Sequence, residues 1–345
     1  MMRLPWFDYR APRSVAEAAK ILADEGPGAM LIAGGTDLLP NMKRKHQTPK
    51  CLVSLSQIKG LKNVSNGGGV TLGSGLTLSE LLKIESIPAA LRQAAAQVAT
   101  VHLRNAGTLG GNLCLDTRCT YYNQNYEWRK AIDFCLKKDG DICWVATASK
   151  RCVAVSSTDT APALIALGAK VKLVSTQGER EVPLEALFNN DGIDYLTRRA
   201  DEILAEVSIP TGWTSSYWKL RRRGAFDFPV LGVAAAVKLA KDGTVEEARI
   251  ALGAAASRPF LVDKAGEFLR GKKLTDEAIA EAGALAASRA KPMDNADFDL
   301  YWRKEVTPDF VGYALRELRG DDMRAMRVRI ARQDLGSGAL PRGGV

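Results

Sequence analysis

Two glycine-rich segments limit what this chain can fold into more than any other feature. The first, LIAGGTD at residues 31–37, continues a short apolar run at 29–32 that is typical of a buried strand. The second, RNAGTLGGN, spans residues 104–112. A strand that ends in Gly-Gly-Thr-Asp leaves several backbone N–H groups free, and such a concave donor surface suits phosphate oxygens. Two such turns could bind one pyrophosphate from both sides, although a single Gly-Gly pair taken alone is better explained by a tight turn.

Neither glycine segment has the spacing of a known nucleotide motif. They match neither G-x-G-x-x-G nor G-x-x-x-x-G-K-[ST], so a Rossmann site and a P-loop are both unsupported. The first segment lies in a predicted βαβ unit, with strands at 29–32 and 51–55 and a helix that starts at Leu38. Strands at 230–239 and 248–256 precede helices at 264–269, 276–289 and 310–319, and strands followed by helices indicate a separate α+β domain.

Composition and charge exclude several classes of protein. The chain has 345 residues, of which 46% are hydrophobic and 25% charged, as in ordinary globular proteins of two or three domains. It has no apolar run of roughly 18 residues for a membrane span, and its start lacks the apolar core of a secretory signal, so we expect a cytoplasmic protein. The net charge of +9 comes from bases that are mostly interleaved with acids, so we expect a solvated face or a dock for an acidic protein partner rather than a nucleic-acid site.

Four of the six cysteines are crowded into one polar segment. Cys119, Cys135, Cys143 and Cys152 have the spacing C-x15-C-x7-C-x8-C. Disulfides are rare in the cytoplasm, so these residues are better interpreted as thiolate ligands. Structural zinc sites use closely spaced cysteine pairs, which are absent here, and a [4Fe–4S] cluster needs four thiolates. The spacing alone does not decide between zinc and iron–sulfur.

Three motifs in order give the chain a family resemblance. LIAGGTDLLPNMK, RNAGTLGGN and STDTAPALIALGA resemble the FAD-binding medium subunits of the molybdenum hydroxylases, and the resemblance extends to about residue 325. It implies a mixed α/β and α+β fold, in which a two-part FAD-binding domain precedes a small α+β domain of antiparallel sheet and helices. The implied boundaries are 1–56 and 57–213 for the two flavin subdomains, 214–325 for the C-terminal domain, and 326–345 for a tail.

The resemblance also implies an FAD site. The pyrophosphate would be wrapped by Leu31, Ile32, Ala33, Gly34, Gly35, Thr36, Asp37 and Leu38. It would be met from the second subdomain by Thr108, Gly111 and Asn112. Val98 would lie against the isoalloxazine ring, Asp159 would hydrogen-bond the ribityl chain or ring edge, and Lys219 would neutralise the flavin near its N1–C2=O end.

The cysteines lie in an insertion relative to most of that family. Other members run almost directly from the GGN turn into the S-x-D-x-x-P-A segment, whereas residues 114–157 intervene here. The 4-hydroxybenzoyl-CoA reductase branch has such an insertion, which carries an additional [4Fe–4S] cluster. The resemblance therefore implies that Cys119, Cys135, Cys143 and Cys152 are cluster ligands. Cys114 is the rival ligand, and its alternative role is that of a small buried hydrophobic residue.

The resemblance implies an electron-input subunit rather than a catalytic one. A ferredoxin would supply electrons through the cluster and FAD to [2Fe–2S] and molybdenum centres of partner subunits, in a dimerised αβγ unit that reduces 4-hydroxybenzoyl-CoA to benzoyl-CoA in anaerobic catabolism. The chain would position cofactors, and its only histidines, His46 and His102, would be structural. The alternatives are a flavin subunit that delivers electrons to NAD or a quinone, and a flavin module whose insert is a zinc-held docking element.

Overall fold

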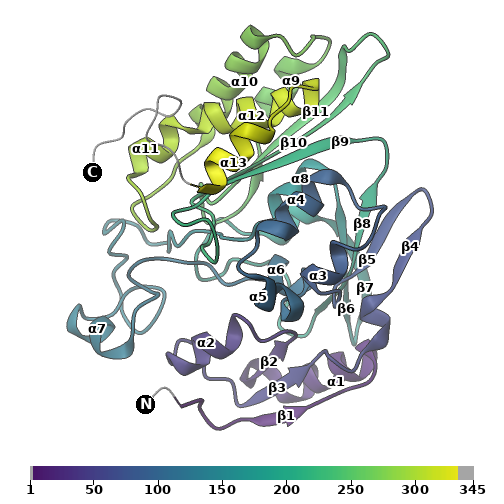
Figure 1. Cartoon of the computed structure of the whole chain (residues 1–345). Helices are drawn as coiled ribbons and strands as arrows, with labels where there is room; N and C mark the ends of the chain where they lie inside the picture. The colour runs from purple at the N-terminus through teal and green to yellow at the C-terminus, as the bar shows by residue number, and fades with distance from the viewer. Residues whose placement is uncertain (1–2, 333–345) are drawn as a thin grey trace.

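The computed structural model describes residues 3–332, which form three β-sheets with helices packed between and around them (Figure 1). The sheets follow one another along the chain, so each belongs to a different part of the sequence. In residues 3–332, no helix combines the length and the apolar character that crossing a membrane requires.

The first sheet is small and parallel. Its strands, in the order β1-β3-β2, are Asp8–Arg10, Cys51–Ser54 and Ala29–Ile32. Helix α1, Val15–Glu25, packs its apolar face against this unit, and Ser14 caps it by accepting a hydrogen bond from the Glu17 N–H. Strand β2 leads into helix α2, Leu38–Lys43, and the chain returns as β3. The expected βαβ arrangement is therefore confirmed.

The second sheet has five antiparallel strands. In the order β4-β5-β8-β6-β7 they are Val64–Asn66, Gly69–Gly73, Ile203–Pro210, Lys170–Ser175 and Gly178–Pro183. Its helices are α3 (Leu78–Leu81), α4 (Ala89–Gln97), α5 (Val101–Ala106), α6 (Leu109–Leu113) and α8 (Thr160–Ala166). Helix α3 begins with a capping box, because Thr77 and Glu80 each accept the other's backbone N–H.

The third sheet is antiparallel and belongs to the C-terminal region. In the order β12-β11-β10-β9 its strands are Phe260–Leu261, Val245–Gly253, Leu231–Leu239 and Thr214–Leu220. The accompanying helices are α9 (Asp263–Leu269), α10 (Asp276–Arg289), α11 (Leu300–Glu305) and α12 (Thr307–Arg319). Helices α9 and α12 pack on this sheet, and α4 and α8 lie between it and the second sheet (Figure 1). The mixed fold predicted from the sequence, with antiparallel sheets and helices, is confirmed.

Three further segments are short 3-10 turns, and one helix lies where a tail was expected. The turns are Gly26–Gly28, Lys59–Lys62 and Leu184–Leu187. Helix α13, Arg324–Arg332, occupies the beginning of the expected tail. It is held by Arg327, which pairs with Glu317 and lies over the Trp218 ring at 4.2 Å. The remainder of the expected tail, from residue 333, lies outside the described residues.

The insertion forms a loop-rich lobe at the side of the molecule (Figure 1). It carries one helix, α7, Tyr126–Ala131, which begins at the cap residue Asn125. Its two ends meet, because the Arg118 N–H donates to the Val155 carbonyl at 2.8 Å and the reverse bond is 2.7 Å long. The lobe therefore leaves and rejoins the body of the protein at one place.

The C-terminal region holds the base of this lobe. The Asn295 carbonyl accepts the Thr120 N–H at 3.1 Å, and the Asn295 side-chain amide donates to the Val153 carbonyl at 2.6 Å. The buried Arg303 fixes the loop that carries Asn295 by donating to the Met293 carbonyl at 3.0 Å. Residues next to Cys119 and Cys152 are thus tied to a part of the chain that is remote in sequence.

Candidate cofactor sites

The two glycine turns lie against each other. A Cβ added at Gly34 would lie 1.9 Å from the Ala106 carbonyl oxygen and 3.0 Å from the Gly107 nitrogen. Gly35 has a φ of +68°, in the left-handed region that favours glycine. The Thr36 hydroxyl also lies beside Gly107. The structure therefore brings the two predicted turns together. Glycine is required at both Gly34 and Gly35 of the first turn.

The first turn presents unpaired backbone donors. Leu31 and Ile32 end strand β2, and Leu38 opens helix α2, so Ala33 and residues 34–37 connect a strand to a helix start. Within the described part of the chain, the N–H groups of residues 34–37 have no hydrogen-bond acceptor. An anion placed at this turn would meet several donors with few side chains in the way.

The second turn differs from the expectation of a matching donor surface. It is folded into the short helices α5 and α6, and Thr108 caps α6 by accepting the Gly111 N–H at 3.0 Å. The Thr108 carbonyl accepts the Asn112 N–H at 2.9 Å. The N–H groups of residues 109 and 110 donate to the carbonyls of residues 76 and 74. These donors are therefore engaged within the chain, and the second turn contributes close packing instead.

Asn112 connects the second turn to the third sequence motif. Its side-chain oxygen accepts hydrogen bonds from the Thr158 hydroxyl at 2.9 Å, the Thr160 hydroxyl at 2.6 Å and the Thr160 N–H at 3.1 Å. All three residues are buried. The STDTAP segment is thereby fixed beside the glycine turns although the insertion separates them in sequence.

Asp159 and Lys219 form a buried ion pair between the second and third sheets. The Asp159 carboxylate accepts hydrogen bonds from Lys219 Nζ at 3.0 Å and from the Tyr217 hydroxyl at 2.8 Å. Burial raises the pKa of Asp159 and lowers the pKa of Lys219, because both charges lose water, and the attraction between them opposes both shifts. The two predicted residues are thus adjacent, and each is engaged with the other.

Val98 lies in the loop between helices α4 and α5, where cationic side chains donate hydrogen bonds to backbone carbonyl groups. Lys219 Nζ and Arg221 Nη1 donate to the Gln97 carbonyl at 3.0 and 3.1 Å, and Arg104 Nη1 donates to the Val98 carbonyl at 2.7 Å. Sequence reasoning placed Val98 and Lys219 in one site but missed Arg104 and Arg221. Arg104 opens the RNAGTLGGN segment and Arg221 lies in a run of three arginines at 221–223, but nothing in the sequence linked either residue to Val98.

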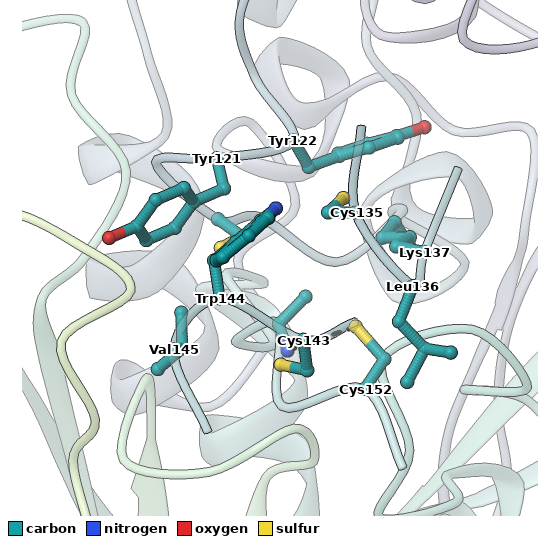
Figure 2. A pocket seen from close by; sticks show the side chains of 11 residues that line it. Tyr121, Tyr122, Cys135, Leu136, Lys137, Cys143, Trp144, Val145 and Cys152 are labelled. Carbon is teal, nitrogen blue, oxygen red and sulfur yellow. Dashed lines mark hydrogen bonds between the residues drawn. The ribbon is translucent and has the colours of Figure 1, made fainter. Parts of the chain in front are cut away.

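The four clustered cysteines line one pocket (Figure 2). The residues that line it are Cys119, Tyr121, Tyr122, Cys135, Leu136, Lys137, Cys143, Trp144, Val145, Cys152 and Ala154. Each of the four cysteines is between 4% and 8% exposed, and Figure 2 shows aromatic side chains around them. Residues spread over the whole insertion therefore line a single pocket, and their role as ligands of one group stays a prediction.

The four cysteines of this pocket are not joined by disulfide bonds. All six cysteines of the chain are free. Burial raises the pKa of Cys119 and raises that of Cys152 to about 11, against the effect of the Ala154 N–H, which donates to Cys152 Sγ at 3.4 Å. In residues 3–332, no three His, Cys, Asp or Glu side chains form a group that could hold a metal ion. The pocket thus fits a polythiolate group by donor type and location, while its side chains do not converge on one ion.

Cys114 lies outside this pocket. It is half-buried and packs against the main hydrophobic core, and burial raises the pKa of its thiol. This placement matches the alternative role of Cys114 as a small buried hydrophobic residue.

A buried lysine holds the insertion together, and sequence reasoning missed it. Lys137 Nζ donates to the Asp116 carboxylate at 2.8 Å, to the Thr117 hydroxyl at 2.7 Å and to the Gly192 carbonyl at 2.5 Å. Tyr122 donates its hydroxyl to the same carboxylate at 3.0 Å. Because Lys137 also lines the cysteine pocket, it ties that pocket to the start of the insertion and to a later loop.

His46 is part of the packing around the insertion. Its ring stacks on Tyr122 with centroids 4.3 Å apart, and Nε2 lies 3.1 Å from the Gln124 carbonyl, which it meets as a donor. Burial lowers the His46 pKa to about 4, so the ring is neutral at physiological pH. His102 lies on the exposed helix α5.

Both parts of the chain match known protein families. Residues 5–212 match the FAD binding domain in molybdopterin dehydrogenase, and residues 215–318 match the CO dehydrogenase flavoprotein C-terminal domain. The chain is 31% identical over 316 residues to the FAD-binding subunit of an aldehyde oxidoreductase from Escherichia coli K12, covering 87% of this chain and 95% of the relative. It is 27% identical to subunit alpha of the 6-hydroxypseudooxynicotine dehydrogenase complex of Paenarthrobacter nicotinovorans, covering 88% and 92%.

Solved structures agree with these matches. Carbon monoxide dehydrogenase from Hydrogenophaga pseudoflava superimposes with a TM-score of 0.73 and 26% identity, over 91% of this chain and 97% of that one. Quinoline 2-oxidoreductase from Pseudomonas putida 86 gives a TM-score of 0.73 and 25% identity, over 92% and 98%. With both domains matched over nearly their whole length, the chain belongs to the family of FAD-binding subunits of molybdenum hydroxylase-type oxidoreductases.

Proposed function

We propose that this chain is the electron-input flavoprotein subunit of a molybdenum hydroxylase complex of the 4-hydroxybenzoyl-CoA reductase type. The observation that carries the proposal is the meeting of Cys119, Cys135, Cys143 and Cys152 in one pocket of an insertion whose base adjoins the glycine turns. FAD and a [4Fe–4S] cluster, when bound, supply the electron-carrying groups. The chain itself holds them, orients them and sets their surroundings.

The FAD part of the proposal assigns roles to the two turns. The unpaired N–H groups of residues 34–37 bind the pyrophosphate, and Thr108, Gly111 and Asn112 close the site from the second subdomain. Val98 packs against the flavin ring. In the proposed division of the chain, residues 1–56 and 57–213 share this site, and residues 214–325 contribute Lys219.

Asp159 and Lys219 have an indirect role in this proposal. Both carboxylate oxygens of Asp159 already accept hydrogen bonds within the chain, and Lys219 Nζ already donates to two oxygens. The pair therefore fixes the Val98 connection beside the flavin and supplies a buried cation close to it. A direct hydrogen bond from either residue to the flavin requires one of these bonds to be exchanged.

The cysteine pocket is assigned to a [4Fe–4S] cluster with one thiolate from each of the four residues. One feature favours this occupant over structural zinc. The four cysteines lie far apart in the sequence, without the closely spaced pairs that structural zinc sites use. Cluster assembly would deprotonate the thiols and draw the loops inward.

The partners follow from the role of an electron-input subunit. The relatives are named as subunits or medium chains of larger enzymes. We assign the present chain to an αβγ unit with a molybdenum-cofactor subunit and a [2Fe–2S] subunit, probed below by native sizing. A ferredoxin is the proposed electron donor, and 4-hydroxybenzoyl-CoA the proposed substrate of the complex.

A second function is favoured by the names of the relatives. Several are dehydrogenases of carbon monoxide, xanthine or glyceraldehyde. A dehydrogenase passes electrons out of its substrate, so a chain of this kind would deliver them from its flavin to NAD or a quinone. The direction of electron flow separates the two functions.

Metal and flavin analysis tests the proposal. The complex is purified without oxygen, and iron, acid-labile sulfide, zinc, molybdenum and flavin are measured per chain. We expect one FAD and about four iron and four sulfide attributable to this subunit, in addition to those of the [2Fe–2S] partner. One zinc without sulfide would instead identify a zinc-held docking element. Reduction of the flavin by NADH but not by reduced ferredoxin would favour the second function.

A further inference from the structure

Arg118 joins the two proposed cofactor sites, because its side chain pairs with Asp37 of the first glycine turn and its neighbour Cys119 lines the cysteine pocket. It is 8% exposed, and its backbone forms the bridge to Val155 that closes the insertion. The next residue, Cys119, lines the cysteine pocket. The Arg118 side chain extends the opposite way, toward the first glycine turn.

The Arg118 guanidinium neutralises a carboxylate in that turn. It forms an ion pair with Asp37, and Nη1 donates to the Asn41 side-chain oxygen at 3.3 Å. Its planar face lies over the Phe228 ring, 4.8 Å from the centroid. Asp37 is the last residue of the donor turn and Asn41 lies in helix α2, so the guanidinium is fixed to the turn itself.

Charge explains why the turn needs this partner. The first turn offers unpaired N–H donors that suit a pyrophosphate, yet it also carries the carboxylate of Asp37. Two anions confined at one site repel each other, and the repulsion grows as water is excluded. A guanidinium paired with Asp37 removes that penalty, and a planar fork is better suited to this than an ammonium group.

We propose that Arg118 is a positioning residue that couples the two cofactor sites. It makes the first turn acceptable to the FAD pyrophosphate by neutralising Asp37, and through its own backbone it fixes Cys119 in the pocket. This inference rests on the proposed function. Coupling between binding sites is reciprocal, so FAD steadies the cysteine pocket to the same extent that an ordered pocket favours FAD.

A charge-rescue cycle tests the first half of this inference. FAD dissociation constants are measured for the full chain and for Arg118→Gln, Asp37→Asn and the double variant, with Arg180→Gln as the matched control. Arg180 is another arginine paired with a buried carboxylate, that of Glu202, but it lies on the second sheet away from both sites. We expect Arg118→Gln to weaken FAD binding about tenfold or more, the double variant to recover most of the loss, and the control to match the unaltered chain.

Thiol reactivity tests the second half independently of cluster assembly. The iron-free chain is treated with 5,5′-dithiobis(2-nitrobenzoate) with and without FAD, and the peptides containing Cys119 and Cys152 are quantified. FAD should slow their modification several-fold in the unaltered chain and in the Arg180→Gln control, and this protection should be lost in Arg118→Gln.

The outcomes separate this inference from the proposed function. An Arg118→Gln chain that binds FAD normally, or one whose loss is not rescued by Asp37→Asn, overturns the charge argument. Equal FAD protection of Cys119 in the unaltered chain and in Arg118→Gln overturns the coupling. An unaltered chain that binds no FAD overturns the proposed function itself, and this inference with it. If Arg118→Gln fails to fold, the Asp37→Asn chain decides the coupling, since it also removes the ion pair and should lose the protection.

Discussion

Single residues decide how close the two halves of the proposed flavin site come. At Gly34 the missing side chain allows the first turn to touch the Ala106 carbonyl, so this glycine is fixed by contact between two backbones. Gly60, in contrast, has nothing within 4 Å of an added Cβ and no positive φ. Replacing glycine by alanine should therefore destabilise the protein at Gly34 far more than at Gly60.

Gly34→Ala should separate the turns. The added methyl would meet backbone on the opposite side, which cannot move aside as a side chain can, so we expect a loss of about 1–3 kcal/mol in the free energy of unfolding. FAD affinity should fall about tenfold or more, because the donor turn shifts. Fluorescence titration with FAD and denaturant unfolding measure both effects, and Gly60→Ala serves as the control. An alanine at 34 that binds FAD normally would remove the first turn from the proposed site.

Lys219→Met should create a pH-dependent loss of stability. It leaves the Asp159 carboxylate buried without its cation, and we expect about 3–5 kcal/mol less free energy of unfolding near neutral pH. Burial already raises the Asp159 pKa, and removing Lys219 raises it further. A carboxyl with a raised native pKa binds its proton more tightly when folded, so the variant is relatively most stable below about pH 4 and loses stability as the pH rises through the native pKa.

Urea unfolding at pH 4.5 and pH 7.5 checks this sign. The deficit of Lys219→Met relative to the unaltered chain should be larger at pH 7.5. Asp159→Asn combined with Lys219→Met removes the titrating group and should have a deficit that is nearly independent of pH. A deficit in Lys219→Met that grows toward acid pH would contradict the account of the pair.

At the scale of elements, the insertion is a lobe built on a fixed base. Its cysteines come from loops rather than from regular structure, and its shape depends on the buried Lys137 and on Asn295 of the C-terminal region. Elements of the body, such as α6 and α8, carry the flavin motifs and are joined directly through Asn112. Substitutions within the lobe, away from its Arg118 junction, should therefore affect the flavin motifs little.

Cys135→Ser should remove the proposed cluster and spare the flavin. The change takes one thiolate from the pocket and touches neither glycine turn. Iron content and the paramagnetic resonance signal of the reduced subunit should fall, while FAD content stays near that of the unaltered complex. Reduced ferredoxin should then bleach the flavin at least about tenfold more slowly. Cys114→Ser is the matched control, because Cys114 packs against the core. Loss of iron in Cys114→Ser but not in Cys135→Ser would show that Cys114, and not Cys135, is a cluster ligand.

Sequence patterns predicted the body of the protein better than the lobe. The strand at 29–32 and the helix that starts at Leu38 were predicted correctly, because an apolar run and a glycine turn are local signals. The second glycine segment was predicted as an open turn, yet it is two short helices whose donors are used by residues 74 and 76. The hydrogen bonds to the carbonyls of residues 74 and 76 form only when the chain folds, so a local sequence pattern does not predict them.

The arrangement of the cysteines in the lobe could not be predicted for the same reason. Its cysteines were identified by number and crowding, whereas their arrangement depends on contacts between distant positions. Lys137 meets Gly192, and Asn295 meets Val153, across separations that a linear pattern does not encode. Arg118 was likewise unremarkable in sequence until its ion pair with Asp37 was seen.

At the scale of the whole molecule, the second and third sheets share one hydrophobic core. The main core includes residues from the second and third sheets, and the Asp159–Lys219 pair crosses the same boundary. The chain is similar over nearly its full length to proteins named as subunits of larger enzymes.

Native sizing should find this chain in an αβγ assembly rather than alone. The expected result is a complex in which it is matched one to one with a molybdenum-cofactor subunit and a [2Fe–2S] subunit, and in which the trimeric unit is present twice. Native mass spectrometry and densitometry of the separated chains measure the ratio. A free monomer that reduces substrate at the full rate would contradict the assignment.

The closed base of the lobe has an evolutionary consequence. Because the backbones of Arg118 and Val155 are hydrogen-bonded to each other, the two ends of the inserted segment stay adjacent whatever the length of the segment between them. Such a segment can change in length without moving the framework ends at Arg118 and Val155, provided that the contacts of Asn295 and Gly192 with the lobe are kept. The sequence of the lobe can therefore vary at a different rate from that of the body. The residues at the junction must remain compatible with both parts.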